Sequence, residues 1–184
     1  IQESYRLFNK SIEHTTEYDG ETLGDYLQRL IATKDQRILP LLIDVMVSKH
    51  VGGRMITEGL WELGTSAKLA MIDSLESTCL YTQVRAANTL GEITDMDSTD
   101  TYLTEKEREY ILNFSIKTLN SIIDNDDSLH LKGSLINTLS FLGDSSTIPL
   151  LHAIATTDTV TTATGRFAYR RIATRAIERI KARE

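Results

Sequence analysis

Leucines recur in this sequence at a spacing that no single helix could produce. Leu30, Leu60 and Leu90 lie thirty residues apart and open the similar frames LIAT, LWELG and LGEIT, and a fourth frame, LSFLG, begins at Leu139. A frame that returns at intervals of roughly 20–50 residues indicates a repeat architecture, in which each unit buries its apolar stripe against its neighbours. We therefore expect these leucines to lie in a core that neighbouring repeats share.

Between these leucines, the spacing of apolar residues predicts helices in pairs. The expected pairs are Glu21–Thr33 with Gln36–Lys49, Arg54–Leu63 with Ser66–Leu75, Tyr81–Ile93 with a helix that resumes by Tyr110, and Leu129–Leu142 with Thr147–Ala155. Helices at Ser4–His14 and Arg166–Arg183 are expected to cap the two ends. The prediction is one all-α domain over 1–184, with an N-terminal cap at 1–20, repeats at 21–51, 52–78, 79–127 and 128–157, and a C-terminal cap at 158–184.

The second helices of three pairs can be aligned without gaps. Leu39-Pro40-Leu41-Leu42 matches Leu69-Ala70-Met71-Ile72 and also Ile148-Pro149-Leu150-Leu151. This alignment predicts that Leu69, Met71, Ile72 and Leu75 point inward. It makes Asp73 and His152 equivalent to Ile43, and Ser74 equivalent to Asp44.

One long insertion interrupts the third pair between Thr94 and Tyr110, and loops of that length are often functional or mobile. Thr104 and Glu107 have the spacing of a capping box, which predicts a helix start there. Asp95, Asp97 and Asp100 superficially resemble a calcium loop, but the glycine and final glutamate of an EF-hand are missing, which favours a solvated acidic loop. His14, His50, His130 and His152 are scattered, so no metal site is predicted. For Cys79, the only cysteine, we expect a small buried thiol rather than a nucleophile.

The formal charge of −6 argues against general binding to nucleic acid, which needs a broad basic face. Residues 166–184 carry +5, which leaves −11 for residues 1–165. The basic face of the last helix, formed by Arg170, Arg171, Arg175 and Arg179, could dock an acidic protein or an anionic surface. The alternative is that this face keeps the C-terminal edge in solution and complements the acidic body.

Non-core positions of the second helices form a second candidate surface. Asp44, Lys68, Asp73 and His152 could form a polar stripe that binds a partner, and the alternative is ordinary solvated surface. Trp61 lies one residue past Leu60 and so leaves the core stripe of its helix. It is either a binding anchor, as tryptophans often are at interfaces, or a side chain half-buried between repeats.

The hairpin frame resembles a known family. A helical hairpin with V-R-x-A-A-x-x-L-x-x-[IL]-G-D in its first helix is similar to the HEAT-like repeats of bacteria and archaea, which include those of phycobilisome lyases. The resemblance covers Glu21 to Lys181, and the second repeat departs from it with Met55-Ile56 where Arg-Ala would stand. It implies a right-handed α-α superhelix, a HEAT-like solenoid of about four hairpins. The residues that carry it are Val84, Arg85, Ala86, Ala87, Leu90, Ile93, Leu139, Leu142, Gly143, Asp144, Ala173, Ile177 and Ile180.

The predicted function is a non-enzymatic scaffold or adaptor that binds another protein on the face lined by the second helices, with no cofactor. Two alternatives stay open. The resemblance implies a lyase or chaperone-like protein that handles a bulky ligand such as a bilin, and a DNA-lesion-binding solenoid resembles the alkylpurine DNA glycosylases. No segment is long and apolar enough to span a membrane. A monomer in the cytoplasm is favoured, and an upstream signal peptide stays open because the first residue is Ile1 rather than Met.

Overall fold

The computed structural model describes residues 23–47, 53–97, 99, 101–123, 129–157 and 168–183, and all regular secondary structure in these ranges is helical. None of the helices in these ranges has the length and apolar content that crossing a membrane requires. The chain divides into two compact units, Ile1–Ser74 and Leu75–Glu184, which are described separately below. The expected helix at Ser4–His14 lies outside the described residues.

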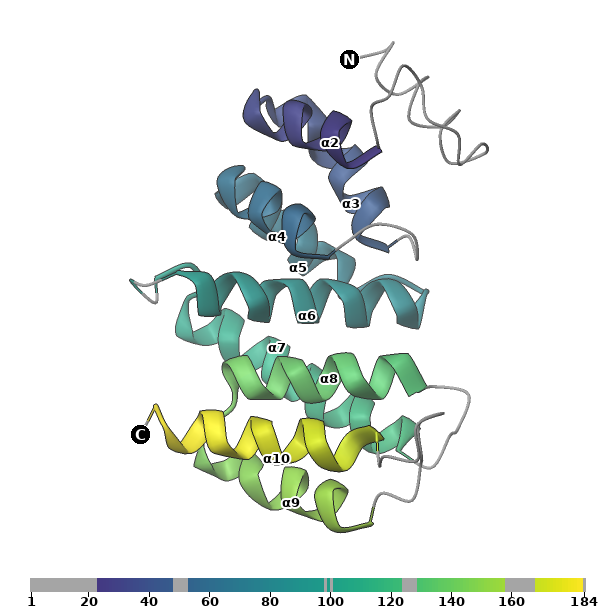
Figure 1. Ribbon diagram of the computed structural model, residues 1–184, viewed down its shortest axis with the longest axis vertical. Coiled ribbons are helices and arrows are strands. Elements are labelled where there is room, and N and C mark those ends of the chain that lie inside the picture. Colours follow the sequence, from purple (N-terminus) through teal and green to yellow (C-terminus); the bar gives the residue numbers. More distant parts are fainter. Residues whose placement is uncertain are drawn as a thin grey trace. The chain divides into compact units, whose positions relative to one another are not determined.

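The first unit contains two helical hairpins (Figure 1). Helix α2 packs on α4, and α3 packs on both α4 and α5. The four predicted helices are confirmed with bounds within two residues, except that the first three residues of the predicted Gln36–Lys49 helix form the 3-10 turn η1 and α3 begins at Leu39. The elements are α2 Leu23–Ala32, the 3-10 turn η1 Gln36–Ile38, α3 Leu39–Val47, α4 Gly53–Glu62 and α5 Thr65–Ser74.

The two turns of this unit differ by one residue. Lys34 and Gly64 end the first helices with positive φ angles of 52° and 63°, and each amide donates to a carbonyl three residues earlier. In the first turn Asp35 follows, and its carboxylate accepts the N–H of Arg37 at 2.9 Å, which caps η1. In the second turn Thr65 starts α5 directly after Gly64. The residue equivalent to Asp35 is therefore missing.

That missing residue changes which side chains of α5 are buried. Ala67 and Met71 in α5 and Leu75, the residue after it, are buried, whereas Leu69 is 52% exposed. These three residues match Ile38, Leu42 and Met46 at an offset of 29 rather than 30. The prediction that Leu69 points inward is therefore wrong, and burial makes Asp44 the equivalent of Asp73.

In the second unit, α6, α8 and α10 lie side by side (Figure 1). Helix α8 packs on α6, α7 and α10, and α9 packs on α10. The predicted bounds of α8 are confirmed to the residue. The elements are α6 Leu80–Met96, α7 Glu105–Ile122, α8 Leu129–Leu142, the 3-10 turn η3 Ser145–Thr147, α9 Ile148–Thr157 and α10 Ala168–Lys181.

The turn before α9 repeats the turn before α3. Asp144 accepts the N–H of Ser146 at 2.8 Å and caps η3, as Asp35 caps η1. In α9, Leu151 and Ile154 are buried at the positions of Leu42 and Val45. The gap-free alignment of these two segments is therefore consistent with the structure.

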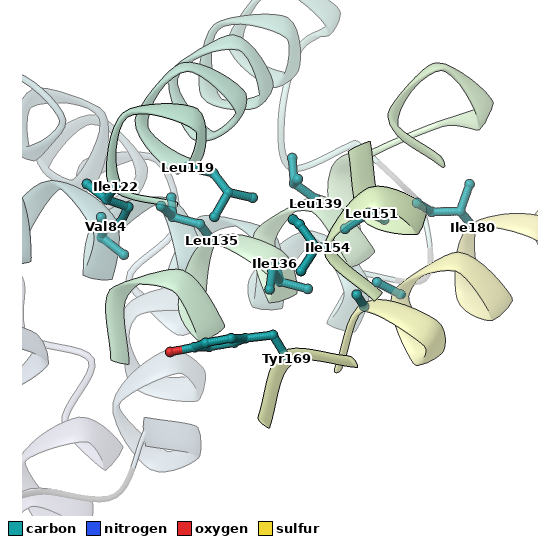
Figure 2. Close-up of a cluster of buried hydrophobic side chains, with 12 residues drawn as sticks. Val84, Leu119, Ile122, Leu135, Ile136, Leu139, Leu151, Ile154, Tyr169 and Ile180 are labelled. Atoms are coloured by element: carbon teal, nitrogen blue, oxygen red, sulfur yellow. The ribbon is translucent and has the colours of Figure 1, made fainter. Parts of the chain in front are cut away.

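The recurrent leucines lie mostly in the core. Leu60, Leu90 and Leu139 are fully buried, and Leu30 is partly buried. In the second unit, Leu139 belongs to a cluster of buried side chains drawn from α6 to α10 (Figure 2). The cluster contains Val84, Leu119, Ile122, Leu135, Ile136, Leu139, Leu151, Ile154, Tyr169, Ala173, Ala176 and Ile180.

Helices extend into both ends of the predicted insertion. Helix α6 continues to Met96, and α7 begins at Glu105 with the predicted capping box. The hydroxyl of Thr104 accepts the N–H of Glu107 at 3.3 Å, and the carboxylate of Glu107 accepts the N–H of Thr104 at 2.7 Å. The connection is therefore shorter than the sequence pattern indicated.

Candidate partner-binding surface

A shallow groove of about 330 Å³ lies between α8 and α10. Asn137 and Phe141 line it from α8, and Ile172, Arg175 and Arg179 line it from α10. One wall is thus basic, while Phe141 and Ile172 supply apolar surface. We call this feature the α8–α10 groove.

The spacing of apolar residues in α10 leaves a row of arginines on one face of the helix, and two of them, Arg175 and Arg179, line the groove. Tyr169, Ala173, Ala176 and Ile180 are buried, so one face of the helix is fixed against the core. Arg171, Arg175 and Arg179 follow each other at four-residue intervals and so share another face of the helix. The sequence alone predicted this basic face.

Arg179 is held in place at the edge of the groove. Its guanidinium forms an ion pair with Asp95 in the last turn of α6 and lies 4.6 Å from the ring centroid of Phe141. Cations over aromatic rings are attracted by the electron-rich face. The C-terminal turns of α6, α8 and α10 therefore meet at this point.

The other three arginines of the predicted set divide into two groups. Arg170 is exposed, and its Nε donates to the carbonyl of Ala155 at 3.0 Å, which ties α10 to α9. Arg171 and Arg175 are exposed and form no ion pair or hydrogen bond within the part of the chain that the structure describes. These two arginines are the cations available to a ligand.

Arg183 has a structural position that the sequence analysis missed. Its guanidinium donates to the carbonyls of Ser140, Phe141 and Gly143 at 2.9, 2.7 and 2.7 Å. A cation at the C-terminus of a helix satisfies the last carbonyls and interacts favourably with the helix dipole. A basic residue one or two positions beyond a terminal helix was the only available signal in the sequence.

A second hollow of about 580 Å³ lies beside Arg183. Its cations, Arg108 and Arg183, are accompanied by Glu105, Glu109 and Asp144. The mixture of charges gives this hollow no net preference for an anion. The α8–α10 groove is different because its lining contains arginines but no carboxylate.

The acidic residues that resemble a calcium loop have other partners. Asp95 pairs with Arg179, and Asp97 accepts the N–H groups of Thr101 and Tyr102 at 2.9 and 2.8 Å. Asp100 lies outside the described residues. Among the residues that are described, no group of three His, Cys, Asp or Glu side chains could hold a metal ion.

Hydrogen bonding lowers the pKa of Asp97 to about 2, mainly through the hydroxyl of Thr99 and further through the backbone N–H groups of Thr99, Thr101 and Tyr102. The pKa of Asp35 is also lowered to about 2, chiefly by the side chain of Arg37. A folded-state pKa below the ordinary value of 3.8 means that protons bind more tightly to the unfolded chain. The two charged carboxylates therefore stabilise the folded state fully above the ordinary pKa of 3.8, and this stabilisation is lost as the pH falls toward their folded-state pKa of about 2.

We expect the stability of the protein to fall between about pH 4 and pH 2 and expect Asp97→Asn to reduce this fall, because the variant removes one of the carboxylates responsible. The urea midpoint, measured at several pH values in this window, reports the effect. Asp73→Asn is the control, since it removes an exposed carboxylate that accepts no hydrogen bond within the described residues. Equal pH dependence in both variants would contradict the role of Asp97.

The predicted partner-binding residues fall in both units. Asp44 on α3 and Asp73 on α5 are exposed, Lys68 on α5 is partly buried, and Trp61 on α4 is 42% exposed. Because α3 packs on α5, the two aspartates occupy equivalent positions of adjacent helices. His152 is exposed on α9 and belongs to the other unit.

The prediction of a buried thiol at Cys79 is wrong. Cys79 is exposed and precedes α6 as its N-cap residue, with φ −93° and ψ 109°. This extended backbone places the residue outside the helix, so the apolar packing of α6 does not cover it. Hydrogen bonding from the backbone and hydroxyl of Thr82 lowers the pKa of the thiol.

The comparisons with known proteins add no relative: no family model, no curated protein and no solved structure matches this chain.

Proposed function

We propose that this protein is a non-enzymatic module that binds another protein. The observation that carries the proposal is the exposure of two large apolar side chains around one turn of the first unit. Trp61 in α4 is 42% exposed and Leu69 in α5 is 52% exposed, on either side of Gly64. Exposed tryptophan at a protein surface is typical of binding hot spots.

The packing of α5 explains why Leu69 is available. Ala67 and Met71 fill the buried face of this helix, so the one-residue shift at the turn leaves Leu69 outside. Asp44 and Asp73 add two exposed carboxylates to the neighbouring helices α3 and α5. An apolar anchor with a polar surround is the usual composition of an interface.

We further propose that the hairpins form a HEAT-like solenoid. The support is the recurrence of burial: positions 38, 42 and 46 recur at 67, 71 and 75, and positions 42 and 45 recur at 151 and 154. Within each unit, alternate helices also pack on each other, as α2 does on α4 and α6 does on α8. Repeats in a solenoid contact only their neighbours in this way.

An affinity pull-down from the source lysate tests the proposed function, with the full chain and the Trp61→Ala/Leu69→Ala variant as baits. We expect the variant to lose a partner that the wild-type chain retains, by a factor of about ten or more, because truncation of an anchoring hot-spot residue costs about 2 kcal/mol or more. Tyr110→Ala is the matched control, since Tyr110 is 41% exposed but lies in the other unit.

Two results would contradict the proposal. One is a partner that the variant and the wild-type chain retain equally. The other is recovery of a small molecule with no protein, which would favour the ligand-handling alternative. Charge reversal by Asp44→Lys/Asp73→Lys then shows whether the acidic pair contributes to the same surface.

A further inference from the structure

We infer that the α8–α10 groove binds an acidic helical peptide segment of a partner protein. The groove lies in the second unit, so this inference concerns a surface other than that of Trp61 and Leu69. Carboxylates of the segment pair with Arg175, which lines the groove, and with Arg171, which lies one turn before it on α10 outside the lining, and an apolar side chain of the segment contacts Phe141 and Ile172.

Arg175 in the basic wall of the groove and Arg171 beside it lack the counter-charge that Arg179 has in Asp95. Arg171 and Arg175 are exposed and form no ion pair within the described ranges, and no carboxylate lines the groove. A guanidinium presents a planar fork of donors that matches a carboxylate in two parallel hydrogen bonds. The groove therefore offers carboxylate sites that the fold itself leaves unused.

Arg179 makes the end of the groove rigid. Its ion pair with Asp95 and its contact with Phe141 fix both the guanidinium and the ring that borders the groove. Groups held in position before a ligand arrives lose little conformational entropy on binding. The apolar wall at Phe141 is thus preorganised, while Arg171 and Arg175 are free to turn toward carboxylates.

The spacing of the arginines indicates the form of the ligand. Residues four apart on a helix are separated by about 6 Å along its axis. Acidic residues four apart on a partner helix repeat at the same distance, so a helix lying along α10 can present one carboxylate to each arginine. Its apolar residues, one turn apart on the adjoining face, then lie over Phe141 and Ile172.

The surroundings of the groove favour a short acidic segment over a long polyanion. Residues 75–165 contain thirteen acidic and five basic residues, and α10 itself contains Glu178. A nucleic acid would place many phosphates near these carboxylates, whereas binding of nucleic acid depends on neutralising several phosphates at once. A peptide confined to the groove avoids this repulsion.

Fluorescence anisotropy with the full chain tests the inference. The probe is a fluorescein-labelled synthetic helical peptide with glutamates four residues apart and leucines on the adjoining face, and a second peptide has glutamine at each glutamate. We expect the glutamate peptide to bind and Arg171→Gln/Arg175→Gln to weaken its binding by about tenfold or more, because two charge-assisted contacts are lost. Lys106→Gln/Lys117→Gln, which removes the same charge from exposed positions of α7, should leave the affinity within about twofold.

A second variant blocks the groove without changing its charge. Asn137 is exposed and lines the groove, so Asn137→Trp should fill it and weaken binding while the circular dichroism spectrum stays unchanged. The Trp61→Ala/Leu69→Ala variant should bind the peptide normally, which separates this test from that of the proposed function.

Three results would overturn the inference. The glutamine peptide binding as tightly as the glutamate peptide would show that carboxylates are not recognised. Equal losses in the arginine variant and the α7 control would show an effect of net charge alone. A heparin fragment that displaces the peptide and binds more tightly, with the same dependence on Arg171 and Arg175, would assign the surface to polyanions.

Discussion

Leu139→Ala should lower the free energy of unfolding by about 2–5 kcal/mol, the range for a buried leucine truncated to alanine. Leu139 is fully buried on α8, and its cluster joins side chains from α6, α7, α9 and α10 (Figure 2). Truncation leaves a cavity among Leu135, Leu151 and Ile154 that helices fixed on several sides cannot close. Urea denaturation followed by circular dichroism measures the loss.

Leu69→Ala is the matched control for this substitution. Leu69 is 52% exposed, so the same chemical change should alter the stability by only about 0.5 kcal/mol. A loss under about 1 kcal/mol for Leu139→Ala, or equal losses for both leucines, would show that Leu139 does not occupy the shared core.

Gly143→Ala should destabilise the protein by about 1–3 kcal/mol, the usual cost of forcing an added methyl into a packed site. A Cβ at this position would lie 2.5 Å from the carbonyl oxygen of Leu139 and 2.6 Å from Oγ1 of Thr147. Both atoms are held by hydrogen bonds and cannot move away without breaking them. The carbonyl of Leu139 accepts the N–H of Gly143, and Oγ1 of Thr147 donates to the carbonyl of Asp144. Thermal or urea unfolding of the single variant reports the cost.

Gly133→Ala, inside α8, should change the stability in the opposite direction. Its Cβ would meet only Cδ1 of Ile172, at an ordinary contact distance of 3.9 Å, and alanine is favoured over glycine inside a helix by about 0.8–1 kcal/mol. We therefore expect a small gain in stability. Equal effects of the two substitutions would contradict the packing at the C-terminus of α8.

Local signals in the sequence were sufficient wherever a few neighbouring residues determine the structure. Thr104 and Glu107 form the predicted capping box, because its hydrogen bonds involve only these two residues. The bounds of α8, Leu129–Leu142, followed from its apolar run and Gly143. The basic face of α10 was expected from its arginines, although Arg170 of that set turns instead to the carbonyl of Ala155 on α9.

The wrong predictions arose where one missing residue shifts the alignment of two helices, and where a residue lies just outside a helix. A gap-free alignment could not register the missing equivalent of Asp35 before α5, so it placed Leu69 inward. For Cys79, the position at a helix start beside Leu80 suggested burial, but the N-cap backbone places the residue outside the helix.

The candidate site was only partly predictable for a different reason. The pairing of Arg179 with Asp95 and the capping of α8 by Arg183 join residues forty or more positions apart in the sequence. Such contacts depend on how α6, α8 and α10 pack, which spacing within one helix does not determine. The groove beside them therefore emerged only from the structure.

Native-state hydrogen exchange of the wild-type chain and of Leu139→Ala tests most directly whether α6, α8 and α10 share one core. If they do, their slowest amides open together, and the substitution lowers the protection in all three helices by the same free energy. A loss of protection confined to α8, with α6 and α10 unchanged, would contradict the packing described here.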